Sequence, residues 1–250
     1  MSYNPFSLEG KTILVTGASS GIGQATAIEC SKLGAKLVIT GRNAERLQET
    51  MNQLEGEGHR QIVAELSELP DIEGFVELVP GISGLALCAG RSFTAPFLFG
   101  TQASYDEIFK INFFSPVQLL RLLTKKKKLQ KGGSVVFVSS TGGNQRHTNG
   151  NSIYGATKAA LTATMRFCAR ELAPKKIRVN AVNPSMVNTP LVKKFQENLS
   201  PEQIAADVKH YPLGRYGEPI DIALAIVYLL SDASAWTTGA SLVIDGGSTI

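Results

Sequence analysis

Short apolar runs alternate with longer amphipathic stretches along almost the whole chain. The runs lack strict polar alternation, as strands covered on both faces do, and lie at 11–16, 36–40, 62–64, 85–87, 135–138, 177–179 and 242–244. Helical periodicity fills 23–33, 44–55, 71–79, 104–129, 154–172, 201–209 and 218–230. Strands that alternate with helices in this way require right-handed crossovers and a mostly parallel sheet. The sequence therefore predicts an α/β fold, a Rossmann-type doubly wound parallel sheet of about seven strands with helices on both faces.

The composition fits one large domain. The chain has 250 residues, of which 43% are hydrophobic and 18% are charged, enough to bury a sizeable core and too apolar for a disordered protein. No internal repeat and no linker rich in Pro, Gly or Ser divides the sequence. We expect a single domain over residues 1–250.

Charge and cysteine content exclude several classes of protein. Lys and Arg number 25 against 21 acidic residues, a net charge of +4 that is too small to indicate a nucleic-acid surface. Three separated cysteines fit a reducing compartment, and the histidines have no metal-ligand spacing. No signal peptide opens the chain, and no apolar run reaches the ~20 residues of a membrane span. We expect a cytoplasmic protein without a metal or a membrane partner.

A glycine-rich loop follows the first predicted strand and opens a helix. Glycines allow a tight turn and a close approach of a ligand, and a helix N-terminus offers free N–H groups to an anion. These features predict a pyrophosphate cradle rather than a plain strand-to-helix turn. Its residues are Gly17, Ser19, Ser20, Gly21, Ile22 and Gly23.

The end of the second predicted strand bears on the choice of cofactor. A site for NAD places an acidic residue there to hold the ribose 2′-hydroxyl. This chain has Arg42 instead, which can pair with a 2′-phosphate through two hydrogen bonds. The sequence therefore predicts NADP(H) in preference to NAD(H), with a solvated arginine at a helix start as the alternative.

Tyr154 and Lys158 form a candidate catalytic pair. A spacing of four places both on one face of a helix, where a lysine charge favours phenolate and lowers the tyrosine pKa. Tyr154 could then donate a proton to a carbonyl or accept one from an alcohol. Ser140 ends the strand upstream and could hydrogen-bond the substrate oxygen. The alternatives are a surface pair and a strand-end cap.

Taken together, these residues resemble the short-chain dehydrogenase/reductase family across the whole chain. The glycine loop, Asn112, Ser140, Tyr154 and Lys158 match the family's motifs in order. The resemblance implies that Tyr154 protonates the substrate oxygen, Ser140 orients it, and Lys158 lowers the tyrosine pKa and holds the nicotinamide ribose. Asn112 would anchor a water that relays protons to Lys158.

The resemblance also implies further cofactor contacts. Glu65 and Leu66 would lie at the adenine, and the backbone of residues 88–90 would touch the cofactor. The segment from Pro184 to Thr189 would hold the nicotinamide amide. The residues added to the cofactor site in this way are Glu65, Leu66, Cys88, Ala89, Gly90, Pro184, Val187 and Thr189, beside Tyr154 and Lys158.

Two departures from the family pattern affect this assignment. Leu87 and Cys88 replace two asparagines, although backbone contacts to a cofactor could survive. The gap between Ser140 and Tyr154 is one residue longer than the family pattern, which makes Thr141 a rival for the hydroxyl role. Neither departure removes a catalytic group.

The resulting hypothesis is an oxidoreductase that transfers a hydride between NADP(H) and a small carbonyl or secondary alcohol. One alternative is a 3-oxoacyl-[acyl-carrier-protein] reductase, whose acidic carrier protein could dock on the lysines at 125–128 and 175–176. Another is a dinucleotide-sensing regulator without catalysis. The family resemblance implies a homotetramer. Residues 186–214 resemble a mobile lid, and Arg91 and Arg146 could meet an anionic substrate.

Overall fold

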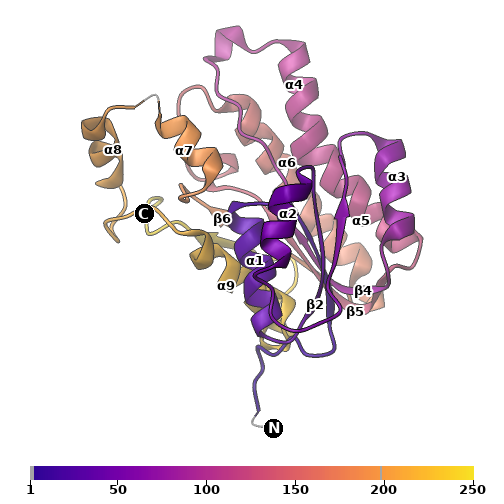
Figure 1. The fold of residues 1–250 in the computed structure, drawn as a ribbon. Helices are drawn as coiled ribbons and strands as arrows, with labels where there is room; N and C mark the ends of the chain where they lie inside the picture. Colours follow the sequence, from indigo (N-terminus) through magenta and orange to yellow (C-terminus); the bar gives the residue numbers. More distant parts are fainter. Residues whose placement is uncertain (1–2, 198) are drawn as a thin grey trace.

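A single seven-stranded sheet organises the molecule. The computed structural model describes residues 3–197 and 199–250. The strands are arranged in the order β3-β2-β1-β4-β5-β6-β7, and every neighbouring pair is parallel (Figure 1). Each predicted apolar run overlaps one of them. Their bounds are Thr12–Thr16, Lys36–Gly41, Arg60–Val63, Ile82–Leu87, Leu129–Val138, Arg178–Pro184 and Ser241–Ile244 for β1 to β7.

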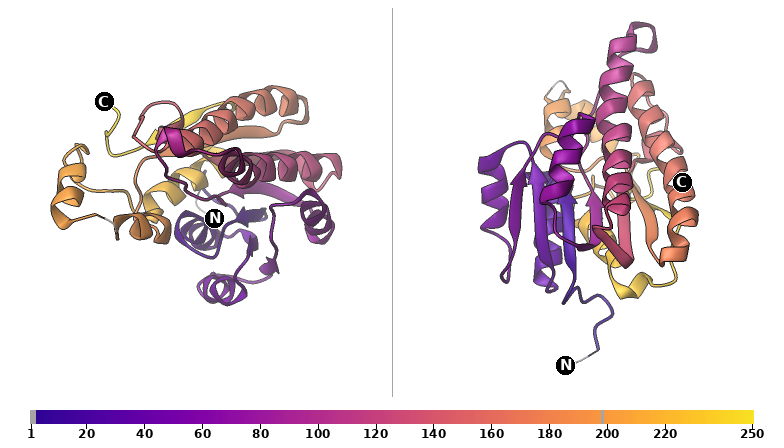
Figure 2. Two further views of the ribbon diagram at one scale, coloured as in Figure 1. Left: turned by 90° about the horizontal axis from the view of Figure 1, so that it is seen from above. Right: turned by 90° about the vertical axis from the view of Figure 1, so that its right-hand side faces the viewer.

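Helices cover both faces of the sheet, which confirms the doubly wound architecture (Figure 2). On one face α1 (Gly21–Lys32), α2 (Ala44–Met51) and α9 (Pro219–Leu230) contribute to a core with side chains such as Ile13 and Leu37. On the other, α3 (Leu69–Leu78), α5 (Ser115–Lys125) and α6 (Ser152–Leu172) pack around Leu14 and Phe137. The central strands are therefore apolar on both sides, which explains why their sequences do not alternate.

The chain reverses direction across the sheet between β1 and β4. From β1 the chain adds β2 and β3 towards one edge of the sheet. It then returns to add β4 on the other side of β1, and the later strands follow towards the opposite edge. In open α/β sheets ligands bind beyond the carboxyl ends of the strands at such a switch point. The loops that follow β1, β2, β4, β5 and β6 meet at this edge.

The prediction of one uninterrupted helix over 104–129 is wrong, because a π-helical turn interrupts it and it ends before residue 129. The structure has α4 (Gln102–Phe109), a π-helical turn (Lys110–Phe114) and then α5, while Leu129 already begins β5. A π turn keeps the helical direction and leaves apolar periodicity almost intact, so the pattern did not reveal it. Lys127 adopts a positive φ of 55°, as residues after a helix end often do.

Two short helices lie in the long connection between β6 and α9. They are α7 (Pro190–Gln196) and α8 (Pro201–Val208), and only α8 was predicted. A capping box between Ser200 and Gln203 fixes the start of α8. The two helices extend to one side of the sheet's carboxyl edge (Figure 1). Among the residues that the structure describes, no helix is long and apolar enough to cross a membrane.

Candidate active site

The glycine loop after β1 is packed so closely that side chains cannot enter it. Gly17 has a φ of 65°, and a Cβ there would lie 2.9 Å from the Cα of Ala89. A Cβ on Gly23 would lie 2.3 Å from the carbonyl oxygen of Gly17. Gly21 opens α1 with a φ of 55°, and its missing side chain leaves room for Thr189. The backbone N–H groups of this turn are thereby available to a phosphate.

Arg42 and Glu65 meet beyond the ends of β2 and β3. The guanidinium Nη1 lies 3.4 Å from the Glu65 Oε2, and both side chains are half or more exposed. The Ser19 hydroxyl lies 3.2 Å from where a Cβ on Gly41 would be, next to Arg42 in the chain. The loosely paired guanidinium is able to exchange a weak carboxylate contact for a phosphate. Leu66 packs against the core beside α3.

The segment after β4 joins the glycine loop to the catalytic side. The Ala89 N–H donates to the Thr16 hydroxyl over 3.1 Å. A Cβ on Gly90 would lie 3.3 Å from the Asn112 Oδ1 and 3.5 Å from the Lys158 Nζ. Burial raises the pKa of Cys88 to about 12, so this thiol is protonated and unreactive at neutral pH. The backbone of residues 88–90 is therefore closely packed even though Leu87 and Cys88 replace the two asparagines of the family pattern.

Tyr154 and Lys158 lie in the first two turns of α6, with Ser140 opposite. The Lys158 Nζ is 5.7 Å from the centroid of the Tyr154 ring. The Lys158 ammonium is buried and donates to the Val138 carbonyl oxygen over 2.9 Å. A Cβ on Gly155 would lie 2.6 Å from the Gly142 carbonyl oxygen. This close approach sets the distance between the Ser140 turn and the helix that carries Tyr154.

Ser140 and Thr141 differ in their surroundings. Both hydroxyls donate to the Pro184 carbonyl oxygen over 3.4 Å. Thr141 is 2% exposed, whereas Ser140 is only partly buried and caps the turn through the Gly142 N–H. The Ser140 hydroxyl also interacts with the Tyr154 phenol, which acts to lower the pKa of that tyrosine. These contacts favour Ser140 over Thr141 as the hydroxyl that meets a substrate.

Burial dominates the electrostatics of the pair. It raises the pKa of Tyr154, and the contact with Ser140 does not offset it. The expected lowering of the Tyr154 pKa by Lys158 is not seen, and the ammonium donates its hydrogen bond to the Val138 carbonyl oxygen. Burial also lowers the pKa of Lys158 to about 8. At neutral pH the pair is a neutral phenol beside an ammonium, the form that can give a proton to a carbonyl oxygen.

Asn112 lies in the π-helical turn, in a position that periodicity alone could not reveal. Its side chain accepts from the Arg91 N–H over 2.8 Å and donates to the Arg91 carbonyl oxygen over 2.9 Å. It also donates to Thr157, on α6 beside Lys158. Thr157 was missed by the sequence analysis. A π turn shifts the backbone hydrogen-bond ladder, as often occurs at functional sites.

The segment after β6 closes the site. The Pro184 carbonyl oxygen accepts the hydrogen bonds from Ser140 and Thr141. Val187 is buried, and Thr189 lies against Gly21. The two arginines considered for anionic substrates are both paired with carboxylates, Arg91 with Glu107 and Arg146 with Asp207. Their charges are therefore neutralised locally.

The residues fit a nicotinamide dinucleotide. A turn with no room for a Cβ at Gly17 or Gly23 leads into a helix N-terminus, and the Arg42 guanidinium lies beyond the end of the next strand. The buried Thr40 hydroxyl beside Gly41 has no hydrogen-bond partner among the residues that the structure describes. Within residues 3–197 and 199–250, no three His, Cys, Asp or Glu side chains gather as a metal site would require.

Replacement of Lys158 by Met should stabilise the fold at neutral pH. In the folded state the pKa of Lys158 is about 8, whereas the unfolded value is near 10.5. Between these values the unfolded chain binds the extra proton, so the contribution of Lys158 to stability rises with pH. Urea unfolding should find Lys158→Met more stable than wild type at pH 7, on the order of 2 kcal/mol, with the difference shrinking towards pH 10. A pH-independent difference, like that expected for exposed Lys126→Met, would contradict the shift.

Comparison with known proteins identifies the family. A family model described as enoyl-(acyl carrier protein) reductase matches residues 17–249. D-erythrulose reductase of Gallus gallus is 34% identical over 96% of both chains, and L-xylulose reductase of Bos taurus is 32% identical over 96% of this chain and 97% of its own. A solved putative 2-deoxy-D-gluconate 3-dehydrogenase of Agrobacterium tumefaciens, with bound NADP, superimposes with a TM-score of 0.88 at 28% identity, covering 98% of this chain and 99% of that one. The chain belongs to the short-chain dehydrogenase/reductase family and is an oxidoreductase acting on carbonyl and alcohol groups.

Proposed function

We propose that this protein uses NADPH to reduce a small uncharged ketone, with a short ketose as the substrate class. The observation that carries the proposal is the meeting of Tyr154, Lys158 and Ser140 beside the glycine loop. Two relatives of similar length are named as reductases of ketoses, D-erythrulose and L-xylulose. The pairing of Arg91 and Arg146 with carboxylates supports an uncharged substrate.

Each residue has a defined task in this proposal. A bound nicotinamide would supply the hydride. Ser140 donates a hydrogen bond to the substrate oxygen and aligns it with the phenol. Tyr154 gives its proton to that oxygen. Lys158, whose ammonium donates to the Val138 carbonyl oxygen, would hold the nicotinamide ribose. Asn112 holds the Arg91 backbone and Thr157 in place, and its turn of helix would anchor the water that returns a proton to Lys158.

The cofactor would lie along the carboxyl edge of the sheet. The loop from Gly17 to Gly23, with Ser19, Ser20, Gly21 and Ile22, would hold the pyrophosphate. Arg42 would pair with the 2′-phosphate, Glu65 and Leu66 would lie at the adenine, and residues 88–90 would contact the cofactor through their backbone. Pro184, Val187 and Thr189 would hold the nicotinamide amide, while Lys158 holds its ribose. One neighbouring structure contains NADP, which supports this cofactor.

Arg42→Ala tests the preference for NADPH. The substitution removes a charge-assisted contact with the 2′-phosphate and should weaken NADPH binding by about 10- to 100-fold. Binding of NADH, which lacks that phosphate, should change less than about threefold. Equilibrium titration of both nucleotides measures the two dissociation constants. Arg60→Ala is the control, because Arg60 begins β3 at the end of the strand away from the proposed cofactor site. Equal losses for the two nucleotides would contradict the assignment.

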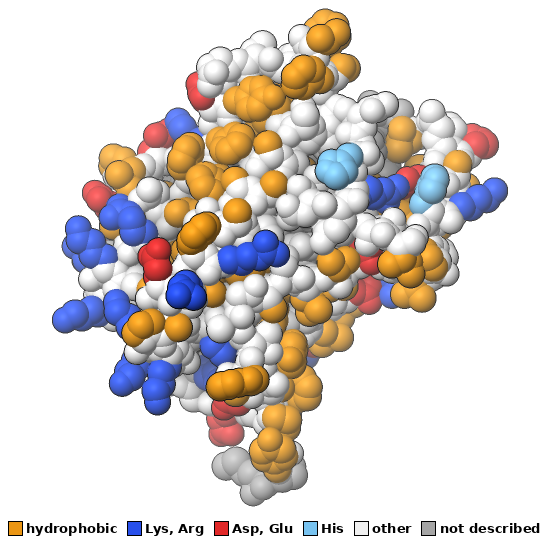
Figure 3. Space-filling model, turned by 180° about the vertical axis from the view of Figure 1, so that it is seen from behind, with side chains coloured by type: hydrophobic (Ala, Val, Ile, Leu, Met, Phe, Trp, Pro, Cys, Tyr) orange, Lys and Arg blue, Asp and Glu red, His pale blue; other side chains and the backbone are white. Residues whose placement is uncertain are grey.

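A carrier-bound 3-oxoacyl thioester is the second candidate substrate. The family model that matches this chain carries the description enoyl-(acyl carrier protein) reductase. The exposed lysines at 125–127 and 175–176 could contact an acidic carrier protein. Lys and Arg side chains gather on one side of the face seen in Figure 3. Faster NADPH oxidation with acetoacetyl-carrier protein than with D-erythrulose would favour this candidate.

We also infer one domain over residues 1–250, a cytoplasmic location and a homotetramer. The three cysteines are all free, which suits a reducing compartment. Phe114, at the end of the π-helical turn, and Phe167 on α6 are 51% and 68% exposed, and such apolar side chains suit subunit contacts. Light scattering of the purified protein would measure the assembly.

A further inference from the structure

A cluster of charged and phenolic side chains lies beside the proposed site and was not predicted. Arg146 follows the Ser140 turn, and Asp207 lies on α8, 61 residues further along the chain. The Arg146 Nη2 is 3.0 Å from the Asp207 Oδ1, and the Nη1 donates to the Tyr211 hydroxyl over 2.9 Å. The exposed fractions of the Arg146 and Asp207 side chains are 22% and 33%. The pair therefore joins two distant segments at a partly buried position.

Tyr216 completes the hydrogen bonds of Asp207. Its hydroxyl donates to the Asp207 Oδ2 over 2.8 Å, so both carboxylate oxygens have partners. Burial and the Asp207 charge together raise the pKa of Tyr216, which keeps this donor protonated. The Tyr211 and Tyr216 rings pack edge to face at 5.2 Å, and both residues are buried. Arg146 also lies over the Tyr211 ring, 5.4 Å from its centroid.

Tyr211 links this cluster to the segment that closes the site. Its hydroxyl is 2.9 Å from the Ser185 hydroxyl and accepts from the Met186 N–H over 3.4 Å. Because Arg146 and Met186 both donate to the Tyr211 oxygen, its own proton is free to go to Ser185. Ser185 follows Pro184, whose carbonyl oxygen accepts from Ser140 and Thr141. The cluster therefore contacts Ser185, and the proposed catalytic hydroxyl of Ser140 contacts the preceding residue, Pro184.

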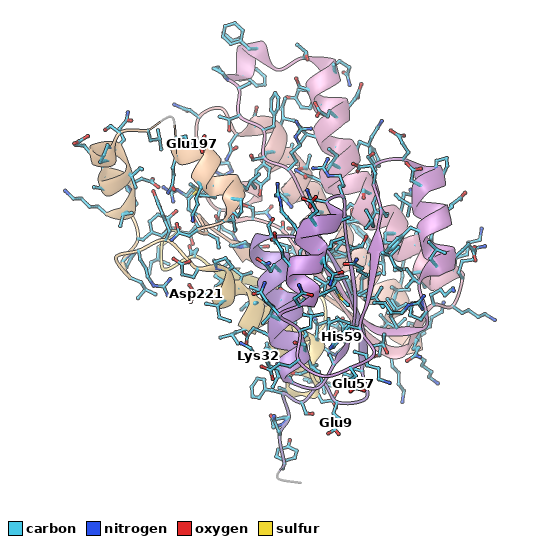
Figure 4. The ribbon with its side chains drawn as sticks, in the orientation of Figure 1. Glu9, Lys32, Glu57, His59, Glu197 and Asp221 are labelled. Atoms are coloured by element: carbon cyan, nitrogen blue, oxygen red, sulfur yellow. The ribbon has the colours of Figure 1, made fainter. Side chains whose placement is uncertain are left out.

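We propose that Arg146, Asp207, Tyr211 and Tyr216 form a clasp that positions the substrate side of the site. The clasp holds residues 199–217, the part of the chain that runs from Glu197 to Asp221 (both labelled in Figure 4), against the Ser140 turn and the Ser185–Met186 peptide. It acts by positioning and makes no contact with reacting atoms. The proposal rests on the proposed function for the identity of the site.

The physical basis is the cost of separating a half-buried ion pair. Loss of either charge leaves the other poorly solvated and leaves donors or acceptors unpaired. Local opening then becomes the less costly response, because α8 has no buried residues of its own. Opening of α8 should release Tyr211 and, through it, Ser185 and Met186. The substrate pocket would be less well formed, while Tyr154 and Lys158 stay fixed on α6.

Hydrogen–deuterium exchange tests the clasp without any substrate. In Arg146→Met and Asp207→Asn, amides of residues 202–211 and 186–189 should exchange about tenfold faster, with α6 amides unchanged. Arg146→Lys keeps the charge but loses the forked geometry and should fall between. Lys126→Met removes an ion pair with Glu77 at the other end of the sheet and should leave these amides unaffected. Wild-type exchange in both variants, or a uniform increase along the chain, would overturn the proposal.

Kinetics separate positioning from catalysis. With NADPH and D-erythrulose, the KM for the ketose should rise about tenfold in Asp207→Asn, with kcat within about threefold of wild type. The combined variant Arg146→Met/Asp207→Asn should lose little more than either alone, because both act through one contact. Additive losses, or a fall in kcat alone, would overturn the clasp. If wild type binds NADPH but does not reduce D-erythrulose, the proposed substrate class fails, whereas the exchange experiment still decides on the clasp.

Discussion

Tyr154→Phe should abolish turnover and leave cofactor binding intact. The substitution removes only the phenolic oxygen, which interacts with Ser140 and is the proton donor in the proposed mechanism. Loss of a positioned general acid typically lowers a rate by about 10² to 10⁴-fold, and we expect a fall in kcat of about 10³-fold or more. The NADPH dissociation constant should stay within about twofold, because the ring and its packing are retained. Steady-state assay with D-erythrulose and nucleotide titration measure the two quantities.

A matched tyrosine serves as the control for this experiment. Tyr228 on α9 also carries a partly buried hydroxyl, 3.4 Å from the Thr237 hydroxyl and far along the chain from α6. Tyr228→Phe should keep the wild-type kcat. Turnover of Tyr154→Phe at the wild-type rate would remove Tyr154 from the mechanism and would leave a nucleotide-binding protein without assigned catalytic groups.

Gly23→Ala should prevent binding of both NADPH and NADH. The added methyl would lie 2.3 Å from the Gly17 carbonyl oxygen, a backbone atom that cannot move without reshaping the glycine loop. A reshaped loop would lose the backbone N–H contacts to the pyrophosphate that both nucleotides share, so we expect both dissociation constants to rise by about 100-fold or more. Titration of each nucleotide against the purified variant measures the loss.

Gly74→Ala is the corresponding control for a glycine in a helix. Gly74 lies in α3, where an added Cβ would meet no atom within 4 Å. Alanine should stabilise this helix by about 1 kcal/mol and leave nucleotide binding unchanged. Undiminished binding by Gly23→Ala would show that the loop does not hold the pyrophosphate.

The order of strands and helices was predictable because burial on both faces leaves a strong local pattern. Val135 to Val138 form a continuous apolar run, and the structure buries all four side chains. Helix boundaries were less predictable. In the π-helical turn around Asn112 the backbone hydrogen bonds span five residues, where those of an α-helix span four. Over a single turn, side-chain periodicity hardly registers that difference.

The candidate site was predictable where its residues share one loop or one helix. The glycine loop and the Tyr154–Lys158 spacing are of this kind. Contacts between segments that are distant along the chain leave no recognisable motif in the sequence. The pairing of Arg146 with Asp207 and of Arg42 with Glu65 depends on how loops approach in space. The direction of the Tyr154 pKa shift was likewise set by burial, which no spacing of residues encodes.

Separate titrations of NADPH and NADH against the purified protein, followed by nucleotide fluorescence, test the central claim most directly. The contact that we propose between Arg42 and a 2′-phosphate predicts that NADPH binds at least about tenfold more tightly than NADH. The advantage should disappear in Arg42→Ala. Tighter binding of NADH would contradict the cofactor assignment, and binding of neither nucleotide would contradict the proposed function as a whole.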